Sequence, residues 1–328
     1  MKFRTEIQIP HSPDQIDYQK KILSVGSCFA ESMGKRLEEM KFQTLVNPLG
    51  IFYNPLSIGK ILQKAIDRQV YFESEYADHL GEWFSFDLHG KFREAEKERF
   101  EEKTTEAVEQ LISWLPNTDW LILTFGTAFV FRKKSDGKIV ANCHKFSGSL
   151  FSRDLLKVEE ITGALKVVFD SLINQNPQLK IILTISPIRH IRDGLSQNNL
   201  SKSVLRLACH ELATHYPFVY YFPSYEIMLD DLRDYRFYKD DFIHPTSFAE
   251  DYIWEKFVEV YVSEDAQTVM REWEKIHRDL KHRPLKADST AYKAFLLKLR
   301  EKLVGISENI DCGVEMEEVN RRLDLEMF

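Results

Sequence analysis

The chain has 328 residues, with 44 Lys and Arg against 51 Asp and Glu, so its formal net charge at neutral pH is −7. This acidic balance argues against a nucleic acid partner, because phosphates attract clustered Lys and Arg. Hydrophobic residues make up 44% of the sequence and aromatic residues 12%, which is ample for a packed core and excludes a mainly disordered chain. The length predicts one large domain or two small ones.

Cysteine usage and the N-terminal sequence predict a reducing compartment and no membrane contact. The four cysteines include no C-x-x-C pair, so neither a disulfide scaffold nor a thiolate zinc site has the required spacing. The N-terminus has no apolar region of signal-peptide type, and no window approaches about 18 uninterrupted apolar residues. We therefore expect a soluble, cytoplasmic protein with reduced thiols, no metal and no membrane partner.

Three strands are predicted from short apolar runs. Residues 22–25 form a β-rich run that ends at Gly26, and a helical pattern follows it at once. Residues 120–125 and residues 180–185 are nearly continuous apolar runs, which is typical of strands buried on both faces of a sheet.

Helical patterns alternate with these strands. The periodicity predicts helices over residues 94–115, 155–173 and 201–215, with Ser201 as the N-cap of the last, and a fourth strand at residues 218–221. Alternating strands and helices predict an α/β protein in which helices cover a parallel sheet. In such sheets ligands bind at the carboxyl ends of the strands, so the loops there are the candidate sites.

Two further features complete the predicted organisation. Residues 129–132 and 138–141 flank a turn-like segment, which predicts a β-hairpin inserted after the second long strand. From about Ser263 the chain becomes charge-rich and helical. We therefore expect an α/β domain over residues 1–262 and a helical C-terminal extension over residues 263–328.

Several common motifs are missing from the sequence. There is no Gly-rich dinucleotide or P-loop motif and no G-x-S-x-G nucleophile elbow. His210 and His215 resemble a zincin pair, but they are five residues apart and would lie roughly 140° apart around a helix. The sequence therefore predicts neither a nucleotide cofactor nor a zinc centre, and we expect no cofactor.

The first candidate for chemistry is the segment Gly26, Ser27 and Cys28, where a strand ends and a helix begins. Free backbone N–H groups and the helix dipole at such a position would activate a nucleophile and stabilise an oxyanion. A purely structural interpretation remains open. In that case Gly26 makes a tight turn, Ser27 caps the helix and Cys28 packs as a small apolar residue.

The second candidate is the pair Asp241 and His244, late in the chain and just before a predicted helix near Ser247. An Asp three residues before a His can hold the imidazole in one tautomer and leave the other ring nitrogen free as a general base. Taken alone, a histidine in a surface loop is the ordinary explanation of such a pair.

Together, five segments resemble the GSCFA family, which is regarded as distantly related to the SGNH (GDSL-like) hydrolases. The segments, in chain order, are VGSCFAE at residues 25–31, NPLGIFYNP at 47–55, ANCHK at 141–145, SPIRHIRDG at 186–194 and the stretch from YFPSYE to DDFIHP at 221–245. The resemblance covers roughly residues 20–260. It implies a flavodoxin-like three-layer α/β/α sandwich and, in active members, ester hydrolysis or acyl transfer.

The resemblance also implies roles for the candidate residues. An alignment with the SGNH pattern without gaps places Cys28 at the nucleophile position, whereas a one-residue gap would place Ser27 there. His244 then corresponds to the general base and Asp241 to the residue that orients it. If Cys28 is the nucleophile, acyl transfer is as plausible as hydrolysis.

The oxyanion donors are harder to place by resemblance. Gly50 corresponds to the oxyanion glycine of SGNH hydrolases, although it could simply serve a turn. The Asn that those enzymes carry after the next strand is missing here, since the chain reads Gly126-Thr127-Ala128. Asn54 and Asn142 are the available substitutes.

Five further residues are candidates for substrate binding. His144 and His190 are ring donors in predicted loops, Arg189 adjoins His190, and Tyr235 and Arg236 precede the Asp-x-x-His loop. The functional interpretation is recognition of an anionic or polyhydroxyl substrate. The alternatives are a solvated turn for the first three and a bracing role for the last two.

Two function classes remain open from the sequence. The first is an SGNH-like esterase or acyltransferase that acts on an acyl ester, for example an O-acylated carbohydrate. The second is a catalytically silent binding or assembly protein with the same fold, which is favoured by the unsettled nucleophile and the missing Asn. The sequence gives neither the substrate nor the oligomeric state.

Overall fold

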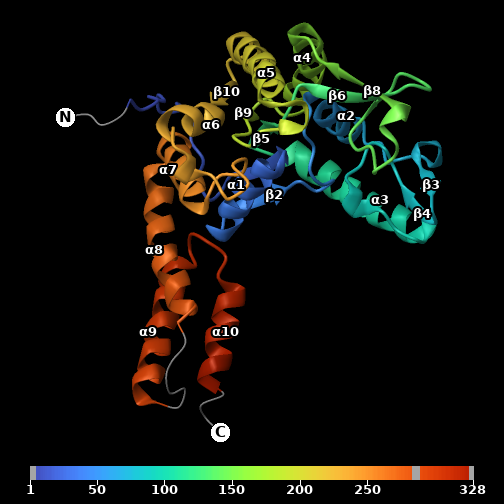
Figure 1. Ribbon diagram of the computed structural model, residues 1–328. Coiled ribbons are helices and arrows are strands. Elements are labelled where there is room, and N and C mark those ends of the chain that lie inside the picture. The colour runs from blue at the N-terminus through green and yellow to red at the C-terminus, as the bar shows by residue number, and fades with distance from the viewer. Residues whose placement is uncertain (1–4, 283–288, 325–328) are drawn as a thin grey trace.

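A five-stranded parallel sheet forms the centre of the computed structural model, which describes residues 5–282 and 289–324 (Figure 1). Its strands lie in the order β2-β1-β5-β9-β10 and every neighbouring pair is parallel. Numbered along the sheet's own strands, this is the 2-1-3-4-5 order of flavodoxin-like folds. The strands are β1 (Lys21–Gly26), β2 (Gln43–Val46), β5 (Trp120–Phe125), β9 (Lys180–Ile185) and β10 (Val219–Phe222).

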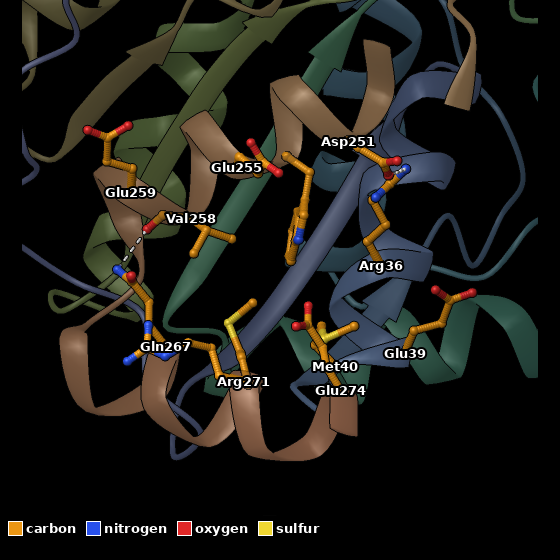
Figure 2. Close-up of a pocket in the computed structure, with 12 residues that line it drawn as sticks. Arg36, Glu39, Met40, Asp251, Glu255, Val258, Glu259, Gln267, Arg271 and Glu274 are labelled. Atoms are coloured by element: carbon orange, nitrogen blue, oxygen red, sulfur yellow. Dashed lines mark hydrogen bonds and ion pairs between the residues drawn. The ribbon is translucent and has the colours of Figure 1, made fainter. Parts of the chain in front are cut away.

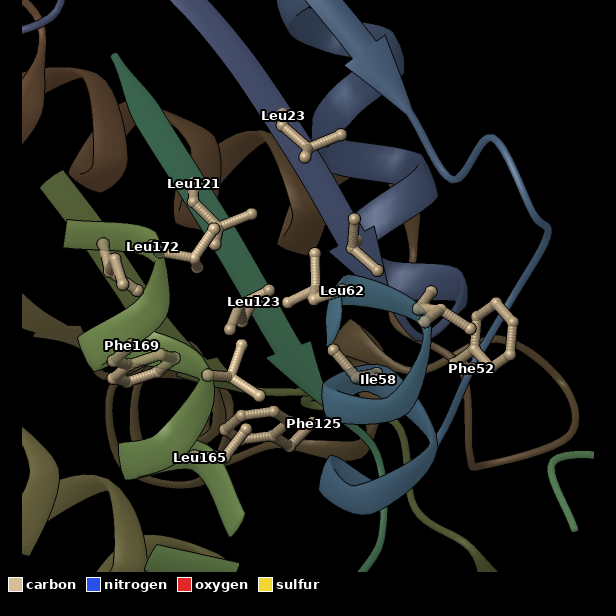
Figure 3. Packing of buried hydrophobic residues seen from close by; sticks show 14 of the residues in the cluster. Leu23, Phe52, Ile58, Leu62, Leu121, Leu123, Phe125, Leu165, Phe169 and Leu172 are labelled. Carbon is tan, nitrogen blue, oxygen red and sulfur yellow. The ribbon is translucent and has the colours of Figure 1, made fainter. Parts of the chain in front are cut away.

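Helices cover both faces of this sheet. On one face, Leu121 and Leu123 of β5 pack in one cluster with α2 (Pro55–Ile66), α4 (Val158–Gln175) and α5 (Leu195–His215), and Figure 3 shows part of this packing. Because side chains alternate along a strand, a single apolar run supplies both cores.

The opposite face carries a second core. Ile22, Ile122 and Ile182 pack there with α1 (Cys28–Glu39) and α7 (Ser247–Tyr261). The molecule is therefore the mixed α/β sandwich, with a central parallel sheet between helical layers, that the sequence predicts.

Smaller elements connect the strands and helices of the sandwich. The predicted hairpin is confirmed as β6 (Phe129–Lys133) and β7 (Ile139–Val140), and β8 (Phe151–Leu155) pairs with the other edge of β6. A second hairpin joins β3 (Ala77–His79) to β4 (Glu82–Phe84) before α3 (Lys97–Trp114). Short helical turns are η1 (Glu73–Glu75), η2 (Gly90–Phe92), η3 (Leu115–Asn117), η4 (Gly148–Leu150), η5 (Ile191–Asp193), α6 (Ser224–Glu226), η6 (Ile227–Asp231) and η7 (Tyr235–Phe237).

The predicted start of one helix is wrong. Helix α5 begins at Leu195 after Gly194, whose φ is +85°, so Ser201 lies inside the helix and is not its N-cap. The Ser201 hydroxyl instead accepts a hydrogen bond from the Ala128 backbone N–H at 2.7 Å. A buried contact between distant segments has therefore replaced the capping role that local sequence suggested.

The C-terminal helices share a core with the sandwich. Helices α8 (Glu264–Leu280), α9 (Thr290–Ile306) and α10 (Gly313–Asp324) extend away from the sheet (Figure 1). Trp273 of α8 and Leu299 of α9 belong to the same buried cluster as α1 and α7. No helix in the described part of the chain has both the length and the apolarity needed to cross a bilayer.

Candidate active site at the carboxyl edge of the sheet

A glycine turn after β1 begins the candidate site. Gly26 has a φ of +146°, and a Cβ there would lie 2.2 Å from the Thr124 carbonyl oxygen. Its N–H donates to the Asn47 side-chain oxygen at 2.8 Å. Only glycine fits this turn, because both the backbone angle and the neighbouring strand exclude a side chain.

Ser27 and Cys28 follow the turn in different environments. Ser27 is fully buried, and its hydroxyl accepts from the Phe29 N–H at 3.3 Å as the N-cap of α1. Cys28 is the first residue of α1 and remains partly exposed. Of the two candidate nucleophiles, Cys28 is the residue that is partly exposed to solvent.

Opposing influences act on the Cys28 thiol. Burial raises its pKa, while the backbone N–H groups of Cys28 and Phe29 and the charge of Lys202 act to lower it. Burial is the largest of these causes, and the net pKa is above its usual value. The resting thiol is therefore protonated at neutral pH and needs a base before it can attack.

Lys202 of α5 lies fully buried beneath this edge of the sheet. Its ammonium donates to the carbonyl oxygens of Gly126 and Ser186, each at 2.7 Å, and so ties together the ends of β5 and β9. Burial lowers the pKa of Lys202 to about 7.

The sequence interpretation missed Lys202, although a signal was present. The residue lies three positions before Leu205 and seven before Cys209, both of which are buried. It therefore occupies the apolar stripe of its helix, where a lysine is rare unless its ammonium is hydrogen-bonded.

Asp241 and His244 form the predicted pair on the loop after β10. One carboxylate oxygen of Asp241 accepts from the backbone N–H groups of Ile243 and His244, each at 2.9 Å. The other lies 2.6 Å from Nδ1 of His244. These hydrogen bonds hold the pKa of Asp241 down, at about 2, so the carboxylate is charged at neutral pH.

The structure does not join this pair to either candidate nucleophile. Within residues 5–282 and 289–324, no hydrogen bond connects His244 with Cys28 or Ser27. His244 is nevertheless near enough to His190 for its charge to act on that ring. The Asp–His pair therefore belongs to the same edge of the sheet, without direct contact with the thiol.

His190 stands over the turn after β5. Its Nε2 would lie 2.9 Å from a Cβ built on Gly126, and its ring meets Tyr53 edge to face at 5.1 Å between centroids. Its backbone N–H donates to the Asn198 side chain at 2.9 Å. Burial, with added repulsion from Lys202 and other cations, lowers the pKa of His190 to about 4, so the ring is neutral.

Local structure already occupies two of the expected oxyanion donors. The Gly50 N–H donates to the Asn47 carbonyl at 2.8 Å in a turn where Gly50 has a φ of +86°. Asn54 caps α2, with its side-chain oxygen accepting from the Ser57 N–H at 2.8 Å and its NH₂ donating to the Ser57 hydroxyl at 2.9 Å. Gly50 therefore has the turn role that the sequence left open, and Asn54 is committed to its helix.

The turn after β5 also offers no free amide. Gly126 and Thr127 both donate their N–H to the Tyr53 carbonyl, at 2.7 and 3.0 Å, and Ala128 donates to Ser201. The Asn that SGNH hydrolases carry here has therefore not been replaced by backbone donors of this turn.

Asn142 and His144 belong to a separate cluster near β4. The Asn142 side-chain oxygen accepts from the His144 N–H at 2.8 Å. His144 is buried against Phe84, its Nε2 lies 2.8 Å from the Ser85 carbonyl oxygen, and burial lowers its pKa. The expected role of His144 as an accessible ring donor is wrong, because the ring is packed in the core of this insertion.

The remaining candidates surround the Asp241 loop. The Arg189 guanidinium donates to the Tyr238 hydroxyl at 3.1 Å and lies over its ring. Tyr235 and Arg236 are exposed, and the Tyr235 ring meets that of Phe242 edge to face at 5.7 Å. Arg189 therefore braces the loop, while Tyr235 and Arg236 stay available to a ligand.

A different pocket lies at the other end of α1. It has a volume of about 430 Å³ between α1, α7 and α8, and its lining combines the apolar residues Met40, Trp254 and Met270 with charged residues that include Arg36, Asp251 and Glu274 (Figure 2). Its lining contains no Cys, Ser or His, so it offers no thiol, hydroxyl or imidazole group for catalysis. The described residues also contain no group of three or more His, Cys, Asp or Glu that could hold a metal ion.

The sheet has the flavodoxin-like strand order, with the Cys28 thiol after its first strand and the Asp241–His244 pair after its last. The chain belongs to the GSCFA family, whose model matches residues 21–257, and the model described as "GSCFA domain protein, C-terminal domain" matches residues 273–325. No curated protein matches the chain.

Two solved structures are similar at low identity. One, from Streptococcus pneumonia and described as "a putative platelet activating factor", is 14% identical with a TM-score of 0.38, covering 74% of this chain and 85% of that one. The other, a carbohydrate esterase family 3 protein from Talaromyces cellulolyticus, is 10% identical with a TM-score of 0.27, covering 50% of this chain and 63% of that one.

Proposed function

We propose that the protein is an SGNH-type ester hydrolase or acyltransferase with Cys28 as its nucleophile. The observation that carries this proposal is the Asp241–His244 pair, in which a charged carboxylate accepts from Nδ1 of the imidazole. In the neutral ring this contact places the proton on Nδ1, so Nε2 is the nitrogen that can take a proton. Cys28 is preferred over Ser27 because its side chain is partly exposed, whereas the Ser27 hydroxyl is buried in a helix cap.

The acylation step follows from these roles. His244 Nε2 takes the thiol proton as Cys28 Sγ attacks the ester carbonyl carbon, and the carbonyl π electrons move to oxygen as an oxyanion. When the oxyanion collapses, the bond to the alkoxy group breaks, and the departing alkoxide takes the proton from His244. The products are a thioester on Cys28 and a free alcohol.

The second step removes the acyl group. His244 takes a proton from water as the water oxygen attacks the thioester carbon, which gives a second tetrahedral oxyanion. When this oxyanion collapses, the C–S bond breaks and the Cys28 thiolate leaves. The thiolate recovers its proton from His244, and a carboxylic acid leaves. An alcohol in place of water gives acyl transfer, and a thioester intermediate supports either outcome.

The proposal requires His244 to approach Cys28 when substrate binds. No hydrogen bond joins them within the described residues, and catalytic hydrogen bonds often tighten only in the substrate complex. The substrate class is an acyl ester, for which O-acylated carbohydrates are one group to test. Exposed Tyr235 and Arg236 are the proposed contacts to its polar part.

A catalytically silent binding protein is the second candidate. It is favoured by two observations, namely the raised pKa of the Cys28 thiol and the gap in hydrogen bonding between that thiol and His244. Such a protein would keep the fold and the Asp–His pair without turnover.

A paired activity and labelling experiment separates the two candidates. Hydrolysis of short-chain acyl esters and alkylation of Cys28 by iodoacetamide are measured for wild type, Cys28→Ala and Ser27→Ala, with Cys143→Ala as the matched cysteine control. The proposal expects loss of hydrolysis in Cys28→Ala alone. Hydrolysis that survives Cys28→Ala but disappears in Ser27→Ala would move the nucleophile to Ser27, and absence of both turnover and labelling in wild type would favour the silent protein.

A further inference from the structure

The proposed reaction lacks an evident oxyanion donor on the β5 side of the site. The N–H groups of Gly126, Thr127 and Ala128 all donate to other protein atoms, and the sequence has no Asn in this turn. Removing one oxyanion donor from an enzyme costs about 10²–10³-fold in rate. An active site of this kind therefore needs a donor that comes from another segment.

The His190 side chain occupies the space directly over this turn. A Cβ built on Gly126 would lie 2.9 Å from Nε2 of His190. The same Cβ would lie 3.1 Å from the Tyr53 ring. A side chain on Gly126 would displace the imidazole. The imidazole of His190 therefore packs directly against the backbone of Gly126.

The ring nitrogens of His190 are available to a ligand. Neither makes a hydrogen bond to any described residue, in contrast to Nε2 of His144, which lies 2.8 Å from the Ser85 carbonyl oxygen. Nδ1 of His144 is completely buried and has no hydrogen-bond partner among the described residues. Neither ring nitrogen of His190 is buried in this way, so solvent can reach both. A half-buried ring with an unused and reachable N–H is the geometry of a ligand donor.

Hydrogen bonds to α5 fix the backbone near His190. Lys202 donates to the carbonyl of Ser186, four residues before His190, and to that of Gly126. Asn198 accepts from the His190 N–H at 2.9 Å, and Tyr53 packs against the ring. These contacts fix the imidazole before substrate arrives, which is what electrostatic stabilisation of a transition state requires.

The charges around the ring suit an anion. Lys202, Arg153 and His244 are the charged groups that act on His190, and all three carry or can carry positive charge. Together with burial they keep the imidazole neutral, so one ring nitrogen always carries a proton at neutral pH. A neutral imidazole among positive charges stabilises a nearby anion by hydrogen bonding and keeps its own proton.

We propose that His190 donates its Nε2–H to the oxyanion formed on Cys28, and so takes the place of the missing asparagine. Lys202 is the positioning residue that fixes His190 through the strand ends. This inference rests on the proposed function, since it assigns a donor to the same reaction. It also gives the ring a more specific role than general substrate recognition.

Two reagents test the donor separately from the nucleophile. A trifluoromethyl ketone forms a reversible hemithioketal when the Cys28 thiolate adds to the carbonyl carbon and the π electrons move to oxygen, and ¹⁹F NMR reports the affinity. Iodoacetamide alkylates the same sulfur with loss of iodide and forms no oxyanion. We expect His190→Phe to weaken ketone binding about 100-fold while leaving the alkylation rate close to wild type.

Controls keep the outcome clear. His190→Gln retains an N–H donor of similar reach and should recover part of the ketone affinity. His89→Ala removes another half-buried imidazole of lowered pKa and should change neither reading. Wild-type ketone affinity in folded, alkylatable His190→Phe would overturn the inference and leave the proposed function intact. A wild type that binds no ketone and resists alkylation would overturn the proposed function, and the role of His190 with it.

Discussion

The two halves of the candidate site have opposite environments. Cys28, His190 and Lys202 lie on or beneath the ends of β1, β5 and β9, and burial shifts each of their pKa values toward the neutral form. Asp241 and His244 lie on an exposed loop, where hydrogen bonds shift the pKa of Asp241 toward the charged form. The buried half therefore contributes fixed geometry, and the exposed half contributes charge and proton transfer.

This contrast separates stability from activity. Substitutions in the exposed half should affect turnover with little change in the free energy of unfolding, because they disturb few packed atoms. Substitutions in the buried half should affect both.

His244→Ala tests the exposed half. We expect kcat for a short-chain ester to fall by about 10³-fold, because general acid–base catalysis is lost, while the thermal unfolding midpoint stays near that of wild type. Steady-state kinetics and a thermal melt measure the two effects. Unchanged kcat in His244→Ala would contradict the assignment of the base, and a large fall in the midpoint would contradict the proposed separation.

Lys202→Met tests the buried half through its pH dependence. The folded pKa of Lys202 is lowered to about 7, so stability falls as pH drops from about 10.5 toward 7, where the unfolded chain alone holds the proton. Because Met does not titrate, the free energy of unfolding of wild type relative to Lys202→Met should rise by about 3 kcal/mol between pH 7 and pH 9.5.

Urea denaturation at the two pH values measures this difference, and all other titrating groups cancel between the two proteins. A relative stability that is independent of pH would show that Lys202 keeps its ordinary pKa in the folded protein. In that case the two hydrogen bonds to backbone carbonyls would fully offset the burial of the cation.

Ser27→Ala tests the boundary between the halves. Loss of the N-cap of α1 should lower the free energy of unfolding by about 1 kcal/mol, with kcat close to wild type. Ser263→Ala, which removes the N-cap of α8, is the matched control and should show a similar loss of stability. Loss of activity in Ser27→Ala without a matching loss in the control would show that the hydroxyl takes part in the reaction.

Arg236→Ala should have the smallest effect on folding. The side chain is 74% exposed and its closest ion pair, with Asp234, is 3.8 Å long, so the free energy of unfolding should change by no more than about 0.5 kcal/mol. A rise in KM for anionic esters at constant kcat would support its proposed contact with substrate. Equal KM values for anionic and neutral esters, each unchanged from wild type, would remove that contact.

Most of the fold could be predicted because its signals are local. The run at residues 120–125 became β5, and the helix predicted at residues 94–115 is α3 (Lys97–Trp114). β8 escaped prediction because Phe151–Leu155 mixes polar and apolar residues and pairs with β6 across the intervening β7 and η4. The start of α5 was misplaced because the Ser201 hydroxyl binds Ala128, a contact that local sequence cannot reveal.

The site divides in the same way. The Asp241–His244 contact follows from a three-residue spacing within one loop, so the sequence was sufficient. Lys202 and His190 depend on where β5, β9 and α5 meet, and residues 126 and 202 are distant in sequence. His144 was misjudged because its burial comes from aromatic residues of the β4 segment, about 60 positions earlier in the chain. The oxyanion roles expected of Gly50 and Asn54 conflict with a turn and a helix cap.

Helix α1 serves two regions at once, with Cys28 at its first residue and the C-terminal helices against its last turn. The Trp273 indole donates to the Glu39 carbonyl at 2.7 Å, and Lys41, just beyond the helix, pairs with Glu315 of α10 at 2.6 Å. A chain cut after residue 262 would leave that carbonyl and the surrounding apolar surface open to water. The C-terminal extension thus stabilises the end of α1, the helix whose first residue is Cys28, and its removal would disturb that helix.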